Sequence, residues 1–351
     1  MTSVTALARP EIRDLHAYEA AQYQSGMVRL NANETAWPPP GDRSSPGLNR
    51  YPQARAMELT SALARHYGIA PDRLIATRGS SEAIDLLIRC FCAAYADDIV
   101  ICPPTFGMYR VYAQVQAAGV REVPLCAERG YAVDVDAIEA AWDDRCKLLF
   151  LCSPNNPTGN TIDSADIDRL CTTLAGRGVI VVDAAYAEFS ARNDLAGLLN
   201  RHDNIVVLRT LSKALGLAGA RCGAAIADPA VIELLERILP PYCFSTPSQD
   251  AVLASLSDRL ASEFDERIAL VRTERARVAD RLERMDSVRR VWPSEANFLL
   301  VEVTDPERFK AAANAGKVLI RDFTKGRYTI DCFRITIGAE AENEQLLSAL
   351  E

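Results

Sequence analysis

The chain has 351 residues, which is more than one hydrophobic core usually supports, so we expect two domains. Its composition is that of an ordinary globular protein, with 49% hydrophobic and 25% charged residues and a net charge of −8. This acidic balance argues against nucleic acid or an anionic membrane surface as the main partner.

The ten cysteines form no Cys-x-x-Cys pair and no Cys/His cluster with zinc-ligand spacing. Several lie inside apolar runs, where cysteine behaves as a small core residue. No segment approaches the ~18 uninterrupted apolar residues of a membrane span, and the first ten residues lack the apolar stretch of a signal peptide. We therefore expect a cytoplasmic protein with reduced thiols, no metal site and no contact with a membrane.

Residues 1–45 carry little periodic pattern and are rich in turn formers, as in Trp37-Pro38-Pro39-Pro40-Gly41. Such a run cannot continue a helix or a central strand. We expect an N-terminal arm that lies over another surface and packs with the smaller domain.

The next part of the chain alternates between helical patterns and short apolar strands. Helices are expected over 55–67, 81–94, 106–118, 135–142 and 164–176. Strands are expected at Ile99–Cys102, Val120–Pro124, Leu148–Cys152, Val179–Asp183, Ile205–Arg209 and Cys222–Ala227. This alternation is typical of parallel βαβ units with both faces of the sheet covered. We therefore expect an α/β domain over 46–245 with a mostly parallel sheet.

The remaining residues, 246–351, are expected to form a smaller α+β domain. Residues 248–292 contain neither glycine nor proline, and apolar residues recur every four positions from Val252 to Ile268. This spacing predicts one long helix with an apolar stripe. A strand, a helix and a strand are then expected at Asn297–Val303, Phe309–Ala313 and Phe333–Ile337.

Three polar residues lie close to the ends of expected strands. Asn156 follows the strand at 148–152, Asp183 ends the strand at 179–183, and Lys213 follows the strand at 205–209. Such groups gather at one edge of a parallel sheet. An amine that forms an imine, an acid for a ring nitrogen and an amide donor are what a phosphorylated aromatic aldehyde requires. Taken singly, each has a plainer interpretation as a surface charge, a helix cap or a turn residue.

Further candidates complete this set. Tyr186 could donate to the phenolic oxygen of the aldehyde, and Phe106 could stack on its ring. A phosphate could bind at the helix start marked by Ser80 and Ser81. Hydroxyls and a guanidinium around Lys213 would add donors to that phosphate, namely Thr210, Ser212 and Arg221.

Over nearly its whole length the chain resembles the fold type I aminotransferases that depend on pyridoxal phosphate (PLP). The similarity rests on Leu30–Glu34, Leu48–Pro52, Cys102–Tyr109, Cys152–Gly159, Thr210–Lys213, Ala218–Gly223 and Phe333–Gly338. The Leu-Asn-Arg-Tyr-Pro and Arg-Ile-Thr-Ile-Gly strings are most similar to the histidinol-phosphate subfamily. Phe106 stands where that subfamily usually has tyrosine.

The resemblance implies PLP held as an imine on Lys213, with Asp183 and Tyr186 as further catalytic residues. It implies a homodimer in which Tyr51 reaches the partner's cofactor phosphate. It also implies that Arg334 anchors the phosphate of the substrate. The other substrate-binding positions implied are Tyr18, Arg321 and Asn156.

The reaction implied is transfer of the amino group of L-histidinol phosphate to 2-oxoglutarate, which gives imidazole acetol phosphate and glutamate in histidine biosynthesis. The alternatives are an aromatic amino-acid aminotransferase, a phosphothreonine-type decarboxylase, and a regulator that binds PLP without catalysis. A nucleotide-binding oxidoreductase would need a Gly-x-Gly-x-x-Gly turn after an early strand, which is absent.

Overall fold

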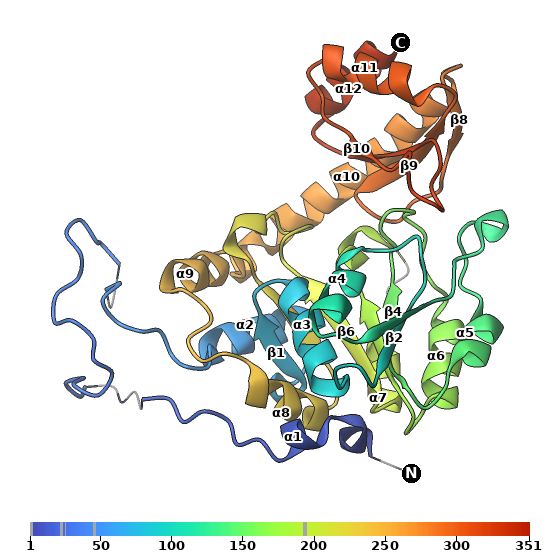
Figure 1. The fold of residues 1–351 in the computed structure, drawn as a ribbon. Helices are drawn as coiled ribbons and strands as arrows, with labels where there is room; N and C mark the ends of the chain where they lie inside the picture. The colour runs from blue at the N-terminus through green and yellow to red at the C-terminus, as the bar shows by residue number, and fades with distance from the viewer. Residues whose placement is uncertain (1–2, 22–23, 25, 45–46, 192–194) are drawn as a thin grey trace.

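A computed structural model describes residues 3–21, 24, 26–44, 47–191 and 195–351. Figure 1 shows a larger body built around one sheet and a smaller body that carries the C-terminus. In the described part of the chain, no helix combines the length and the apolar composition needed to cross a membrane.

The larger body contains a seven-stranded sheet in the order β1-β7-β6-β5-β4-β2-β3. Its strands are β1 (Leu74–Thr77), β2 (Asp98–Ile101), β3 (Gly119–Glu122), β4 (Cys146–Cys152), β5 (Val179–Asp183), β6 (Ile205–Thr210) and β7 (Gly223–Ile226). Neighbours from β3 through β6 pair in parallel, whereas β7 runs antiparallel to both β6 and β1. The prediction of a mostly parallel α/β sheet is confirmed.

Two details of this sheet differ from the expectation. The strand β1 was not predicted, because a four-residue apolar run has no periodicity to read. The expected strand at Cys222–Ala227 exists as β7 but returns antiparallel to β6. The residues between β6 and β7 form only the 3₁₀ turn Ala218–Ala220, and a parallel return requires a longer crossover.

Helices cover both faces of the sheet. One face packs against α2 (Met57–Tyr67), α5 (Val135–Ala141), α6 (Ser164–Thr173) and α7 (Ala196–Arg201). The other packs against α3 (Ser80–Phe91), α4 (Met108–Val115) and α8 (Pro229–Ile238). Successive side chains of β4 alternate between these two cores, with Leu149 in the first and Phe150 in the second. Burial on both faces explains the continuous apolar runs of the strands.

The five expected helices of this body are confirmed as α2 to α6, and their ends differ by up to three residues. Side-chain caps determine where two of them start. Asp134 accepts a hydrogen bond from the backbone of Ala137 at the start of α5, and Asp163 accepts one from Ala165 at the start of α6.

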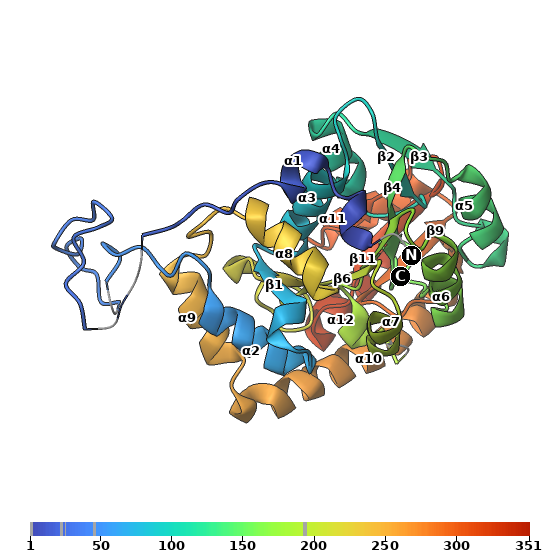
Figure 2. The same cartoon turned by 90° about the horizontal axis from the view of Figure 1, so that it is seen from below.

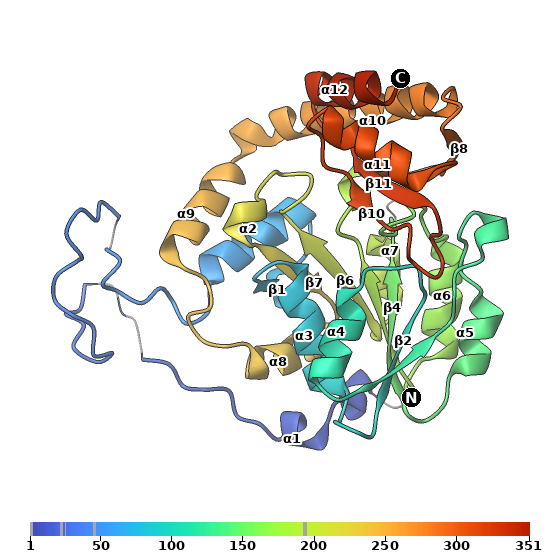
Figure 3. The same cartoon turned by 45° about the horizontal axis from the view of Figure 1, so that its top comes forward.

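The prediction of one long helix over 248–292 is wrong. Helix α9 (Thr246–Ser255) ends before a short 3₁₀ turn, α10 (Ala261–Glu283) follows, and Val288–Val291 is strand β8. Figure 3 shows that α9 and α10 together curve around the larger body. One straight helix could not follow this path.

The smaller body contains a four-stranded antiparallel sheet in the order β10-β11-β9-β8. Its remaining elements are β9 (Phe298–Val303), α11 (Pro306–Ala315), β10 (Arg321–Asp322), β11 (Cys332–Thr336) and α12 (Glu340–Leu350). The expected strand, helix and strand correspond to β9, α11 and β11. A separate core joins this sheet to α10, α11 and α12. We propose a domain boundary near residue 245 on this basis.

The beginning of the arm packs on the large domain rather than on the small domain expected from the sequence. Val4, Ala8 and Ile12 are buried against α3 and α8, and Arg237 of α8 donates to the backbone carbonyls of Ile12 and Arg13. The short helix α1 (Pro10–Arg13) ends this contact. Figure 2 shows that the following residues leave the body as an extended segment.

Candidate active site

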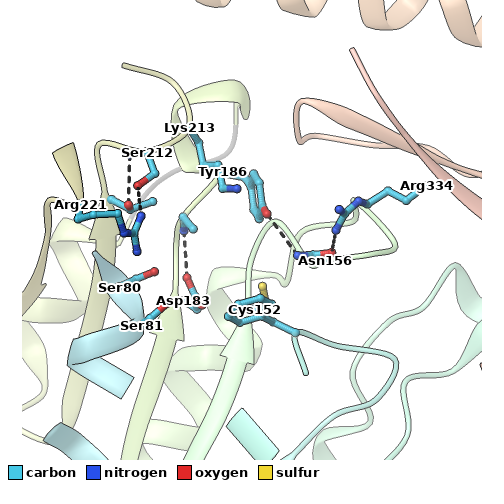
Figure 4. Close-up of a pocket in the computed structure, with 13 residues that line it drawn as sticks. Ser80, Ser81, Cys152, Asn156, Asp183, Tyr186, Ser212, Lys213, Arg221 and Arg334 are labelled. Atoms are coloured by element: carbon cyan, nitrogen blue, oxygen red, sulfur yellow. Dashed lines mark hydrogen bonds between the residues drawn. The ribbon is translucent and has the colours of Figure 1, made fainter. Parts of the chain in front are cut away.

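A cavity of about 230 Å³ opens at the carboxyl ends of β4, β5 and β6. All of its lining residues except Arg334 belong to the large domain. They are Ser80, Ser81, Phe106, Cys152, Asn156, Asp183, Ala185, Tyr186, Thr210, Ser212, Lys213, Arg221 and Arg334. Figure 4 shows the side chains of Asp183, Lys213 and Tyr186 gathered around one space, with Arg334 entering from the small domain.

Lys213 lies in the loop between β6 and β7. The loop is closed by two backbone hydrogen bonds, from Leu211 to Cys222 and from Leu217 to Leu211. The amine faces the cavity, 5.5 Å from the ring centre of Tyr186. Partial removal from water lowers the pKa of Lys213, and the positive charges of Arg334 and Arg221 lower it further. A larger fraction of this amine is therefore neutral and nucleophilic near pH ~7 than for an ordinary lysine.

Asp183 is buried at the end of β5. Its Oδ2 accepts a hydrogen bond from the Tyr109 hydroxyl at 2.8 Å, and its Oδ1 accepts one from the backbone of Ala185 at 3.2 Å. Burial raises the pKa of Asp183, although both donors and the charge of Lys213 oppose this rise. A cation placed in the cavity would lower the pKa of Asp183 and so favour its ionised form.

An anion-binding corner lies at the start of α3. The helix begins after Gly79 with no side-chain hydrogen bond capping its first turn, and Ser80 and Ser81 at this start line the cavity. Free backbone N–H groups and hydroxyls at a helix start favour an anion. Arg221 crosses this corner and donates to the Ser212 hydroxyl at 3.2 Å. A Cβ atom on Gly79 would lie 2.7 Å from Nη2 of Arg221. The glycine therefore lets the guanidinium lie against the backbone, as a phosphate cradle requires.

A chain of polar groups crosses the opposite side of the cavity. Arg334 donates through Nη1 to Oδ1 of Asn156, and Nδ2 of Asn156 donates to the Tyr186 hydroxyl at 3.2 Å. Burial raises the pKa of the Tyr186 phenol well above its usual range, so the phenol keeps its proton. Because Arg334 orients the amide of Asn156, the small domain controls a donor on the large domain.

Three of the expected site residues do not line the cavity. Arg321 on β10 lies directly opposite Arg334 on β11, and both guanidinium groups pack on the ring of Phe323, at 5.8 and 5.6 Å from its centre. Tyr18 on the arm and Tyr51, which follows the arm, have 68% and 51% of their surfaces exposed. These two tyrosines are not brought to the cavity of their own chain.

The cavity also involves residues to which no role was assigned from the sequence. Cys152 and Ala185 line it. The hydroxyl of Tyr109, which lies outside the lining, donates a hydrogen bond to Asp183. Tyr109 occurs in the Cys102–Tyr109 motif, three residues after Phe106. That spacing was a signal that both side chains could serve one site, but it did not indicate which residue Tyr109 contacts.

The residues present fit PLP. An amine, a buried carboxylate, an aromatic wall and an anion cradle surround one space at the carboxyl ends of parallel strands. This fold and this site define the class of PLP-dependent enzymes of fold type I.

Comparison with known proteins gives the family. The pattern of the aminotransferase class I and II family matches residues 18–350, and the chain belongs to this family. The chain is 44% identical to the histidinol-phosphate aminotransferase of Xanthomonas campestris pv. campestris (strain 8004), over 99% of this chain and 97% of that protein. The expected aminotransferase activity and PLP cofactor are thereby confirmed.

Two solved structures share the fold. A putative histidinol-phosphate aminotransferase from Erwinia carotovora atroseptica SCRI1043 matches with a TM-score of 0.77 and 26% identity, over 86% of this chain and 87% of that chain. The Sinorhizobium meliloti histidinol-phosphate aminotransferase in complex with PLP matches with a TM-score of 0.77 and 22% identity, over 86% of this chain and 82% of that chain.

Proposed function

We propose that the protein transfers the amino group of L-histidinol phosphate to 2-oxoglutarate and so forms imidazole acetol phosphate and glutamate in histidine biosynthesis. The observation that carries this substrate is Arg334 on β11, which lines the cavity, together with Arg321, which lies directly opposite it on β10. Two adjacent guanidinium groups suit a dianionic phosphate better than a single carboxylate. The names of the relatives support the same substrate.

This pair also argues against the alternative of an aromatic amino-acid aminotransferase. Aromatic amino acids bring one carboxylate and no phosphate, so one of the two cations would be left without a partner. Burial lowers the pKa of Arg334, and the like charge of Arg321 lowers it further. A dianion relieves this repulsion.

When bound, PLP supplies an electron sink for the carbanion left as the substrate loses its proton. Asp183 would hold a positive charge on the ring nitrogen, and Phe106 would pack on the ring face. Asn156 and Tyr186 would donate to the phenolic oxygen. The residues that would hold the phosphate at the start of α3 are Ser80, Ser81, Thr210, Ser212 and Arg221.

Lys213 moves the proton. With the substrate amine bound in its place, the free amine of Lys213 would accept the proton from the substrate carbon as a base and give it up again as an acid. The lowered pKa of Lys213 favours the neutral form that this step needs. Arg334 fixes the far end of the substrate, so the reacting carbon stays within reach of Lys213.

The substrate is tested by adding amino donors to the PLP-loaded protein and recording its absorbance. We expect L-histidinol phosphate to convert the visible band of the lysine-bound cofactor rapidly into the near-ultraviolet band of its aminated form. We expect L-histidinol, which lacks the phosphate, to react with kcat/KM lower by about 10²-fold or more. L-Phenylalanine serves as the second comparison. Faster conversion with phenylalanine than with histidinol phosphate would contradict the proposed substrate.

We also propose that the protein is a homodimer in which Tyr51 serves the site of the partner. The arm and the residues that directly follow it expose large apolar side chains that a single chain leaves uncovered, namely Leu15, Tyr18, Met27, Val28, Leu30, Trp37, Leu48 and Tyr51.

The backbone of Tyr51 is nevertheless held firmly. Its N–H donates to Glu34 at 2.8 Å, and its carbonyl accepts from Arg29 at 3.3 Å. An exposed side chain on an ordered backbone is suited to reach the site of another subunit. We propose that Tyr18 likewise binds substrate in the site of the partner.

A heterodimer of two defective chains tests this arrangement. One chain carries Lys213→Ala, the other carries Tyr51→Ala, and different affinity tags allow the mixed dimer to be purified. If Tyr51 acts across the dimer, one of the two sites regains both residues, and about half of the wild-type activity returns at limiting PLP. If Tyr51 serves its own chain, the mixed dimer is no more active than the Tyr51→Ala homodimer. A monomer in light scattering would contradict the dimer itself.

We further propose a cytoplasmic location. All ten cysteines are unpaired, as is usual where thiols are kept reduced.

A further inference from the structure

Tyr109 lies behind the wall of the cavity and is completely buried on α4. Its ring stacks on Phe150 of β4 with the ring centres 4.8 Å apart, and meets the ring of Phe106 edge-on at 5.7 Å. These two contacts restrict rotation of the ring. The hydroxyl therefore has a defined direction, which is toward Asp183.

The carboxylate of Asp183 receives one protein donor on each oxygen. Tyr109 donates to Oδ2 at 2.8 Å, and the backbone of Ala185 donates to Oδ1 at 3.2 Å. An ionised carboxylate oxygen accepts about two hydrogen bonds. Asp183 therefore keeps acceptor capacity for the cavity that it lines, and the direction of the remaining lone pairs depends on the two donors.

The titratable groups that face Asp183 come from four elements. They are Tyr109 on α4, Cys152 at the end of β4, Tyr186 after β5 and Lys213 after β6. Burial raises the pKa of both phenols and of the thiol, so these three stay neutral. In the part of the chain that the structure describes, Tyr109 is the one of these three neutral groups whose side chain donates a hydrogen bond to Asp183. It remains a donor throughout the range in which a carboxyl group titrates.

We propose that Tyr109 is a positioning residue that keeps Asp183 ionised and directs its free lone pairs to the ring nitrogen of the cofactor. The inference rests on the proposed function, in which Asp183 faces that nitrogen. Tyr109 acts through Asp183 and does not line the cavity itself.

Tyr109→Phe tests this role, because it keeps both ring contacts and removes the donor. A hydrogen bond to a buried charge changes an equilibrium about ten- to a hundred-fold. We expect kcat to fall by that factor with little change in KM. We also expect the NMR signal of ¹⁵N-labelled PLP in the protein to move toward the neutral ring nitrogen. Asp183 without its donor protonates at a higher pH, so the acidic limb of the pH–rate profile should move to higher pH.

The matched control is Tyr131→Phe. Tyr131 is also buried, and its hydroxyl donates to the backbone carbonyl of Tyr328 at 3.1 Å, away from the cavity. This variant loses one hydrogen bond of the fold but none at Asp183. The nitrogen signal and the acidic limb should therefore match those of the wild type. The inference would be overturned if Tyr109→Phe also showed the nitrogen signal and the acidic limb of the wild type.

A second variant covers the case in which Tyr109→Phe does not fold. Replacing Tyr109 with 3-fluorotyrosine nearly preserves its shape and makes the phenol a stronger donor, so the acidic limb should move to lower pH. An unchanged acidic limb would overturn the inference. Failure of the wild type to develop the visible band with PLP would instead overturn the proposed function, and this inference with it.

Discussion

Lys213→Ala is expected to abolish the visible absorbance of the lysine-bound cofactor and to lower kcat by at least about 10⁴-fold. The substitution removes both the amine that binds the cofactor covalently and the group that moves the proton. Lys213 faces the cavity from a surface loop, so the fold should be preserved. Absorbance, circular dichroism and the transamination rate measure the three effects.

The covalent bond is located by reducing the PLP-loaded wild type with borohydride and finding the labelled peptide by mass spectrometry. The label should lie on Lys213 and be absent from the variant. Lys147→Ala is the control, since Lys147 lies at the opposite end of the sheet near Asp97 and Asp144. A visible band that survives Lys213→Ala would refute the assignment of the lysine.

Asp183→Asn is expected to lower kcat by about 10²- to 10³-fold, because the amide keeps the shape of the carboxylate but loses its charge. Without that charge the ring nitrogen loses its proton, and the carbanion is less stable. Steady-state kinetics of the PLP-loaded variant measures the loss. A kcat within about threefold of the wild type would contradict the role given to Asp183.

The same substitution should not weaken the fold of the cofactor-free protein at neutral pH. The folded-state pKa of Asp183 is raised by burial, so the native state binds more protons than the unfolded state above pH ~4. The contribution of Asp183 to the free energy of unfolding therefore falls as pH rises from that value through the folded-state pKa. Asp183→Asn removes the group that titrates, and with it this loss of stability at higher pH. Urea unfolding of both cofactor-free proteins should show that the free energy of unfolding of the variant increases relative to that of the wild type as pH rises above ~4.

Much of the large domain could be predicted because its signals are local. The alternation of helical and apolar patterns is enough to identify β4, β5 and β6, and the carboxyl ends of parallel strands meet at one edge. The positions of Asn156, Asp183 and Lys213 after these strands therefore implied that they lie together. The cavity does bring them together.

Other features depended on contacts between distant parts of the chain. The break between α9 and α10 follows the curvature of the large domain, which an apolar stripe does not encode. The beginning of the arm lies on α8 because Val4, Ala8 and Ile12 find a buried surface there. A turn-rich sequence shows that an arm exists, but it carries no information about which surface the arm contacts.

By itself, the sequence determined the α/β class, the chemistry of the large-domain residues and their order at the strand ends, because these follow from periodicity and residue type. The tertiary structure decided which groups act on one another. It brought Arg334 from the small domain to Asn156, aligned Arg321 with Arg334, and directed the hydroxyl of Tyr109 to Asp183. The physical reason is that a hydrogen bond depends on the distance and angle between two side chains, and packing of separate elements sets both.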